Sequence, residues 1–100
     1  MEIRSVKHKA LKAVMASDQP INVKGLDAQL SRKIHQQITI LKAAKTIRQV
    51  ADSFPGWKVH ELTPKTPGKW SLWVSGNYRL TFQLDHATAE ITELDFEDYH

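Results

Sequence analysis

Apolar residues in the first half of the chain recur every three or four positions, which is the spacing of an amphipathic helix. The longest run covers residues 27–44, and Asp27 is placed to cap its first turn. Shorter runs predict helices over 8–16 and 46–51, and a first strand is expected at 3–6. The buried stripe of the long helix would consist of Leu30, Ile34, Ile38 and Leu41.

In the second half the period changes to two. Residues 69–84 alternate apolar and polar side chains on both sides of a turn at 75–77, which predicts a hairpin with one apolar face. Strand-like runs at 54–62 and 88–94 flank the hairpin, and a tail follows. Because the helices come first and the strands after, the chain is predicted to be α+β, with helices on one face of a mostly antiparallel sheet.

The chain has 100 residues, enough for one hydrophobic core and too few for two, so residues 1–100 are predicted to form a single domain. Cysteine is absent, which excludes disulfide bonds and thiolate zinc sites and is typical of a reducing cytoplasm. No secretion signal is expected, and no apolar run approaches the ~18 residues that cross a membrane. We therefore expect a cytoplasmic protein without a membrane partner.

Charge is distributed unevenly along the chain. Residues 1–83 hold all 14 Lys and Arg beside five acids, a balance of +9, whereas residues 84–100 hold six acids and no base, a balance of −6. A basic body suits a protein that binds a polyanion such as nucleic acid. A lysine-rich solvated surface explains the same numbers, so charge alone leaves both interpretations open.

Covering one side of the sheet with helices would leave the other side open. Lys58 and His60 lie on one side of their expected strand, and Trp73 and Arg79 share a side of the hairpin. A basic, partly aromatic open face suits single-stranded nucleic acid, on which Trp73 could stack. Trp73 could equally fill a second, smaller core.

Two residues of this face have side chains that could act on a phosphodiester. His60 could accept or donate a proton near neutral pH, and Arg79 could hold a phosphate and stabilise a developing negative charge. The plainer interpretation makes His60 a surface residue and pairs Arg79 with Glu90 or Glu93 across the sheet.

The tail ends in Asp98, Tyr99 and His100, an unusual group for a chain end, which often frays. The α-carboxylate that His100 carries would favour its protonated form, which suits acid catalysis or phosphate binding. Alternatively, Phe96 and Tyr99 only tuck the tail against the core, and His100 has no role.

The other aromatic and imidazole side chains have simpler assignments. Trp57 and Trp70 are expected in the core, and His8, His35 and His86 on the surface, because the three histidines show no ligand spacing with any partner. We therefore predict no metal site and no cofactor.

The residues singled out above resemble the HigB family of the RelE/ParE toxin superfamily. The chain reads PGWKVHEL at 55–62, WSL at 70–72, VSGNYRLTF at 74–82 and DYH at 98–100. The family has PG-x-R-x-H-x-L, W-S-(I/V)-R-V-S-G-N-(Y/W)-R-(I/L)-T-F and a closing DYH. SVKHKALK at 5–12 is also similar to the family's opening SFKHKGL-K, so the resemblance spans nearly the whole chain.

This resemblance implies a RelE-like fold and a ribosome-dependent mRNA endonuclease that needs no metal. It also implies a cognate helix-turn-helix antitoxin, with operator DNA bound only through the toxin–antitoxin complex. The positions that it implicates in catalysis are His60, Arg79, Asp98, Tyr99 and His100. We expect Lys58, Lys65, Lys69 and Trp73 to bind RNA.

The chain also departs from the family pattern. The family's lysine three residues after the histidine is Thr63 here, its later basic pair is Thr66 and Pro67, and its hairpin arginine is Trp73. Lys65 and Lys69 could replace part of the lost charge. The alternative functions are a non-enzymatic or attenuated toxin that binds the ribosome or gyrase, and a plain nucleic-acid-binding module, although the last strand is acidic where such a module would be basic.

Overall fold

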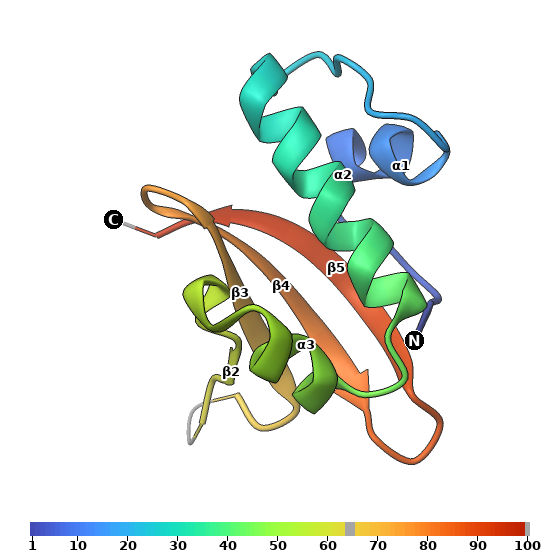
Figure 1. Cartoon of the computed structure of the whole chain (residues 1–100), viewed down its shortest axis with the longest axis vertical. Coiled ribbons are helices and arrows are strands. Elements are labelled where there is room, and N and C mark those ends of the chain that lie inside the picture. Colours follow the sequence, from blue (N-terminus) through green and yellow to red (C-terminus); the bar gives the residue numbers. More distant parts are fainter. Residues whose placement is uncertain (64–65, 100) are drawn as a thin grey trace.

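Five strands form one sheet in the order β1-β5-β4-β3-β2 in the computed structural model, which describes residues 1–63 and 66–99 (Figure 1). The short β1 runs parallel to β5, and the other neighbours are antiparallel. The predicted α+β class with a mostly antiparallel sheet is therefore confirmed. The strands are β1 (Glu2–Ile3), β2 (His60–Glu61), β3 (Lys69–Ser75), β4 (Tyr78–Asp85) and β5 (Glu90–Asp98).

Each of the three α-helices in the described part of the chain begins after a side chain that accepts a hydrogen bond from its first turn. The helices are α1 (Lys9–Met15), α2 (Ala28–Ala43) and α3 (Ile47–Ser53). Asp27 accepts from the amide of Leu30 at 2.8 Å, as the sequence predicted. His8 and Thr46 cap α1 and α3 in the same way.

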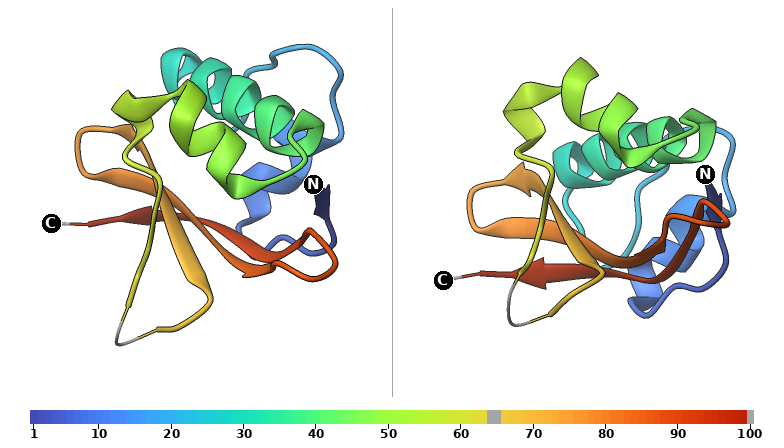
Figure 2. Two further views of the ribbon diagram at one scale, coloured as in Figure 1. Left: turned by 60° about the horizontal axis from the view of Figure 1, so that its bottom comes forward. Right: turned by 90° about the horizontal axis from the view of Figure 1, so that it is seen from below.

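The helices α2 and α3 lie together over one face of the sheet (Figure 2), while α1 packs against α2 and β5. The apolar stripe of α2 packs against the apolar face of the hairpin. The residues of the helical repeat and those of the strand alternation therefore form one core between the two layers. The fully buried members of this core include Leu11, Ile34, Leu41, Leu72, Leu80, Phe82, Ile91 and Leu94.

Three strands differ from their prediction. β1 covers Glu2–Ile3 instead of 3–6, and Val6 forms only an isolated bridge with Leu94. The run at 54–62 forms a 3₁₀ turn at Pro55–Trp57, and Lys58 is left-handed with φ 51°, so β2 keeps just two residues. The last strand continues through Asp98 instead of ending at 94. Glu93 has φ 53° inside β5, near a register shift opposite 81–83, and this bulge let the strand continue past the point where the alternation breaks.

The prediction that His8, His35 and His86 lie on the surface is wrong for the first two. His8 is half-buried because its Nδ1 accepts from Ala10 at 3.1 Å and its ring meets Phe96 edge-on at 5.7 Å. His35 is half-buried against the carbonyl oxygen of Ser17, 3.1 Å away, whereas His86 is exposed as expected. Trp57 is buried in the core, and Trp70 packs against the core at its edge.

Candidate active site

The face of the sheet away from α2 and α3 carries a row of chemically active side chains. Trp73 pairs with Arg79, and Arg79 pairs with Glu97, so these three share one face across β3, β4 and β5. Leu72, which precedes Trp73, and Leu80, which follows Arg79, point into the core. His60 belongs to this open face too, because it pairs with Ser71 and thereby extends the next row, formed by Ser71, Thr81 and Asp95.

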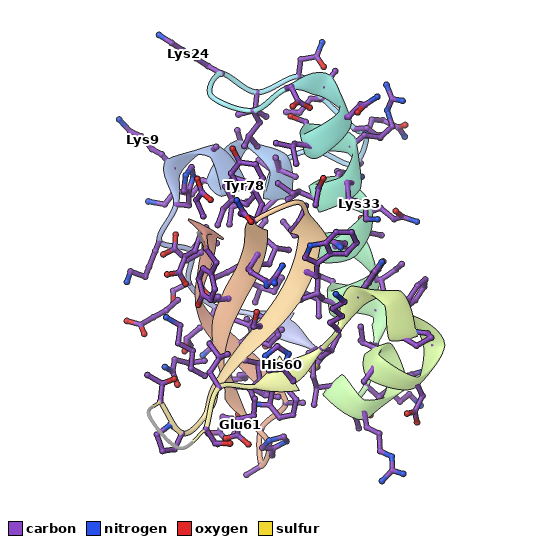
Figure 3. All side chains as sticks on the ribbon, turned by 90° about the vertical axis from the view of Figure 1, so that its left-hand side faces the viewer. Lys9, Lys24, Lys33, His60, Glu61 and Tyr78 are labelled. Atoms are coloured by element: carbon purple, nitrogen blue, oxygen red, sulfur yellow. The ribbon has the colours of Figure 1, made fainter. Side chains whose placement is uncertain are left out.

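The side chain of His60 is exposed and its orientation is fixed by one contact. Its Nδ1 lies 2.7 Å from the carbonyl oxygen of Lys58. Because a carbonyl can accept and cannot donate, Nδ1 carries the hydrogen, and Nε2 of the neutral ring remains an acceptor. The left-handed conformation of Lys58 aims its carbonyl at the ring. Figure 3 shows His60 low on the sheet, well separated from Tyr78 at the upper end.

Arg79 lies next to the end of the chain. Its guanidinium carbon is 6.0 Å from the centre of the Tyr99 ring, which is within the range of a cation–π contact. The amide of Tyr99 donates to the carbonyl oxygen of Asn77 at 2.7 Å, and this bond ties the segment after β5 to the hairpin turn. Glu90, one of the two alternative partners of Arg79, instead forms an ion pair with Arg4 at 2.7 Å.

Asp98 occupies the other side of β5. It pairs with Tyr78, and its neighbours on that strand face are Phe96 and Tyr78, whose rings stack 5.0 Å apart. The structure therefore brings His60, Arg79 and Tyr99 to one face and directs Asp98 to the opposite one. His100 and Lys65, which the sequence also singled out, lie outside the described residues.

The expected RNA-binding residues on the open face already have protein partners. Lys58 Nζ lies 5.7 Å above the Trp73 ring, and Trp73 Nε1 donates to the carbonyl oxygen of Gly76 at 2.9 Å. Lys69 forms an ion pair with Glu97 at 3.3 Å, and Glu97 also accepts a hydrogen bond from the hydroxyl of Thr81. The charge of Lys69 is thus balanced by a carboxylate that lies in register with Arg79.

Residues 4–100 match the family of RelE-like HigB toxins of type II toxin–antitoxin systems. The chain belongs to this family. A curated relative, the endoribonuclease HigB of Proteus vulgaris, is 33% identical over 98 residues, which cover 98% of this chain and 99% of the relative. Membership of a toxin–antitoxin family gives this HigB-like toxin an antitoxin as a partner.

The sequence missed Glu97 on the open face of this HigB-like toxin. The sequence contained a signal for this position. In a strand, side chains two residues apart lie on the same side, so Glu97 must share a side with Tyr99 if the tail is a strand. Among residues 1–63 and 66–99, no three His, Asp or Glu side chains gather as a group that could hold a metal. None of the helices described combines the length and the apolar character needed to cross a membrane.

Proposed function

We propose that this HigB-like toxin is a metal-independent endoribonuclease that cleaves mRNA on the ribosome. The supporting observation is that His60, Arg79 and Tyr99, from three separate segments, lie on the same open face of the sheet, with Arg79 against the Tyr99 ring. The name of the Proteus vulgaris relative points to the same activity. The antitoxin would be a helix-turn-helix protein that neutralises the toxin in the cytoplasm, and operator DNA would be bound through their complex.

The reaction uses the nucleophile that RNA itself provides. The 2′-oxygen of the ribose attacks the adjacent phosphorus, the new O2′–P bond forms, and the P–O5′ bond breaks to leave a 2′,3′-cyclic phosphate. Nε2 of His60 can accept a proton on this face, because Nδ1 already donates to Lys58, so it takes the 2′ proton. Arg79 stabilises the extra negative charge that the phosphate gains in the transition state.

The chain end completes the site in this proposal. Tyr99 keeps the guanidinium of Arg79 in place through the face of its ring. His100 donates a proton to the leaving 5′-oxygen. Asp98 faces away from the site, on the other side of β5. Its role in this proposal is to hold in place the segment that carries Tyr99 and His100.

The RNA strand is held by charge and stacking. Lys58 and Trp73 form a platform on which a base can stack, with Lys65 and Lys69 contacting phosphates. Because Lys69 is paired with Glu97, a phosphate must compete with that carboxylate. Residues 1–100 act together as one domain in this function.

A translation reaction with a defined message tests the proposal. The purified protein should cut the message only when ribosomes are present, and its products should end in a 2′,3′-cyclic or 3′-phosphate. A 2′-deoxy sugar at the cut position should block cleavage, as should Arg79→Ala. The matched control is Arg48→Ala, which removes an arginine from the exposed surface of α3. Products with 3′-hydroxyl ends, or cutting of the deoxy message, would exclude this mechanism.

A further inference from the structure

A cleft of about 350 Å³ lies beside the open face, between the start of α2 and the β3–β4 hairpin. It is lined from α2 by Leu30 and Lys33, and from the hairpin by Trp73 and Tyr78. Clefts that bind small ligands typically have volumes of ~300–1,000 Å³, so this one is large enough for a nucleotide. Figure 3 shows Lys33 and Tyr78 towards the same, upper end of the molecule.

The cleft lies beside the part of β3 that continues past the end of its neighbour β2. β2 pairs with Ser71 and Trp70, so the part of β3 from Trp73 onward is an edge among the residues described. Gln37 ties this edge to α2, since its Nε2 donates to the carbonyl oxygen of Trp73 at 2.9 Å. Lys33 is one helical turn before Gln37 on the same side of α2, where the helix and the hairpin separate.

Trp73 connects the cleft to the candidate active site. By register it shares the open face with Arg79, and Lys58 lies over its ring there. Trp73 also borders the cleft, where its backbone carbonyl faces Gln37 of α2. A single strand of RNA that lies across Arg79 can therefore pass over Trp73 and enter the cleft without crossing the sheet.

We infer that this cleft binds a nucleotide of the RNA substrate that flanks the nucleotide at the cut. The inference rests on the proposed function for the identity of the ligand. Trp73 supplies a surface for base stacking, and Lys33 supplies a charge for the phosphate. The ring of Tyr78 forms a fixed wall, because it is stacked on Phe96. Gln29, at the rim, has an amide that can hydrogen-bond a base edge.

Binding of a short RNA to the free protein tests the inference without ribosomes. The probe is an RNA trinucleotide with a 2′-deoxy sugar at its central position, so that 2′-oxygen attack cannot cut it. Titration followed by NMR should shift the amides of Leu30, Lys33 and Tyr78 and the indole N–H of Trp73. Trp73→Leu should weaken binding about tenfold, because stacking on aromatic rings carries much of single-strand affinity.

The salt dependence of binding gives a readout that a purely structural role would not change. Lys33→Gln should lower the slope of log affinity against log salt concentration by about 0.7, the value for one phosphate contact on a single strand. Lys33→Arg should keep the slope of the original protein. Lys42→Gln removes an exposed lysine from the other end of α2 and should leave both slope and affinity unchanged.

The outcomes separate this inference from the proposed function. If the probe shifts residues of the open face and not those of the cleft, the subsite is wrong while the cleavage activity stands. If the cleft responds but Arg79→Ala cuts messages normally, the subsite stands and the proposed active site is wrong. If Lys33→Gln leaves trinucleotide binding intact and weakens the complex with the antitoxin, the cleft is a protein-docking site and the inference is overturned.

Discussion

The side-chain amide of Gln37, in the middle of α2, donates a hydrogen bond of 2.9 Å to the backbone carbonyl of Trp73 in β3. Gln37 is completely buried, and its Oε1 has no hydrogen-bond partner among residues 1–63 and 66–99. A buried polar group without a partner is costly, so the bond to Trp73 compensates for part of an unfavourable burial. This bond links the helical layer to the edge of the sheet on which Trp73 lies.

Replacing Gln37 by Leu should lower the free energy of unfolding by ~0.5–1.5 kcal/mol, because the partly buried carbonyl of Trp73 would lose its hydrogen bond to the protein. Urea denaturation measures this difference. Gln36→Leu is the control, since Gln36 is exposed on the same helix and should change stability by less than ~0.5 kcal/mol. A Gln37→Leu protein as stable as the Gln36→Leu protein would show that the bond contributes nothing.

The tryptophans at 57 and 73 should respond differently to truncation. Trp57 is 6% exposed and belongs to the core, so Trp57→Ala should cost ~3–5 kcal/mol of stability. Trp73 is partly buried at a free edge, so Trp73→Ala should keep the fold and weaken RNA binding by ~1–3 kcal/mol. Thermal melting and RNA binding, measured on both variants, check this contrast. Equal losses of melting temperature would place Trp73 in the core.

Glu97→Gln should affect RNA binding more than it affects folding. Both side chains of the Lys69–Glu97 pair are 29% exposed, and pairs with that much exposure stabilise by ~0–1 kcal/mol. Removing the carboxylate frees Lys69, so affinity for RNA should rise and its salt dependence should steepen. Asp52→Asn, which also removes the carboxylate of a surface ion pair, should do neither. Cleavage that stops while RNA binding is unchanged would instead give Glu97 a part in the chemistry.

Ala89 has φ 57°, a left-handed conformation that an L-residue with a Cβ disfavours by ~1–2 kcal/mol. Ala89→Gly should therefore raise the free energy of unfolding, by up to ~1 kcal/mol after the greater entropy of glycine in the unfolded chain is subtracted. Ala87→Gly, in the same turn and without a positive φ, should lower stability. Chemical denaturation of the two variants gives the signs, and a destabilising Ala89→Gly would contradict this explanation.

Periodicity was sufficient to predict the layers. The stripe from Leu30 to Leu41 and the alternation through 69–84 each specify one buried face, and two such faces have few ways to cover each other. The same alternation predicted that Trp73 and Arg79 share one side of the hairpin, and the register pairs them directly. These predictions depend on local spacing, which the sequence states directly.

The predictions that failed depend on backbone irregularities. Lys58 has a left-handed conformation and Glu93 opens a bulge, and each changes which side the next residues face. The last strand was therefore expected to end at 94, whereas it continues through Asp98, which faces away from Tyr99. The cleft beside Lys33 depends on where β2 stops, a tertiary property that no single segment of the sequence encodes.

The pairing of β1 with β5 constrains the order in which this toxin can fold during its own synthesis. Glu2 and Ile3 cannot pair until Glu90 and Ile91 have been synthesised. β5 is also the second neighbour of β4 in the sheet. Contacts so distant along the chain slow folding, because a long loop must close before they contribute stability. The open face with Arg79 and Tyr99 therefore stays incomplete until residues 90–99 have been synthesised and have joined the sheet.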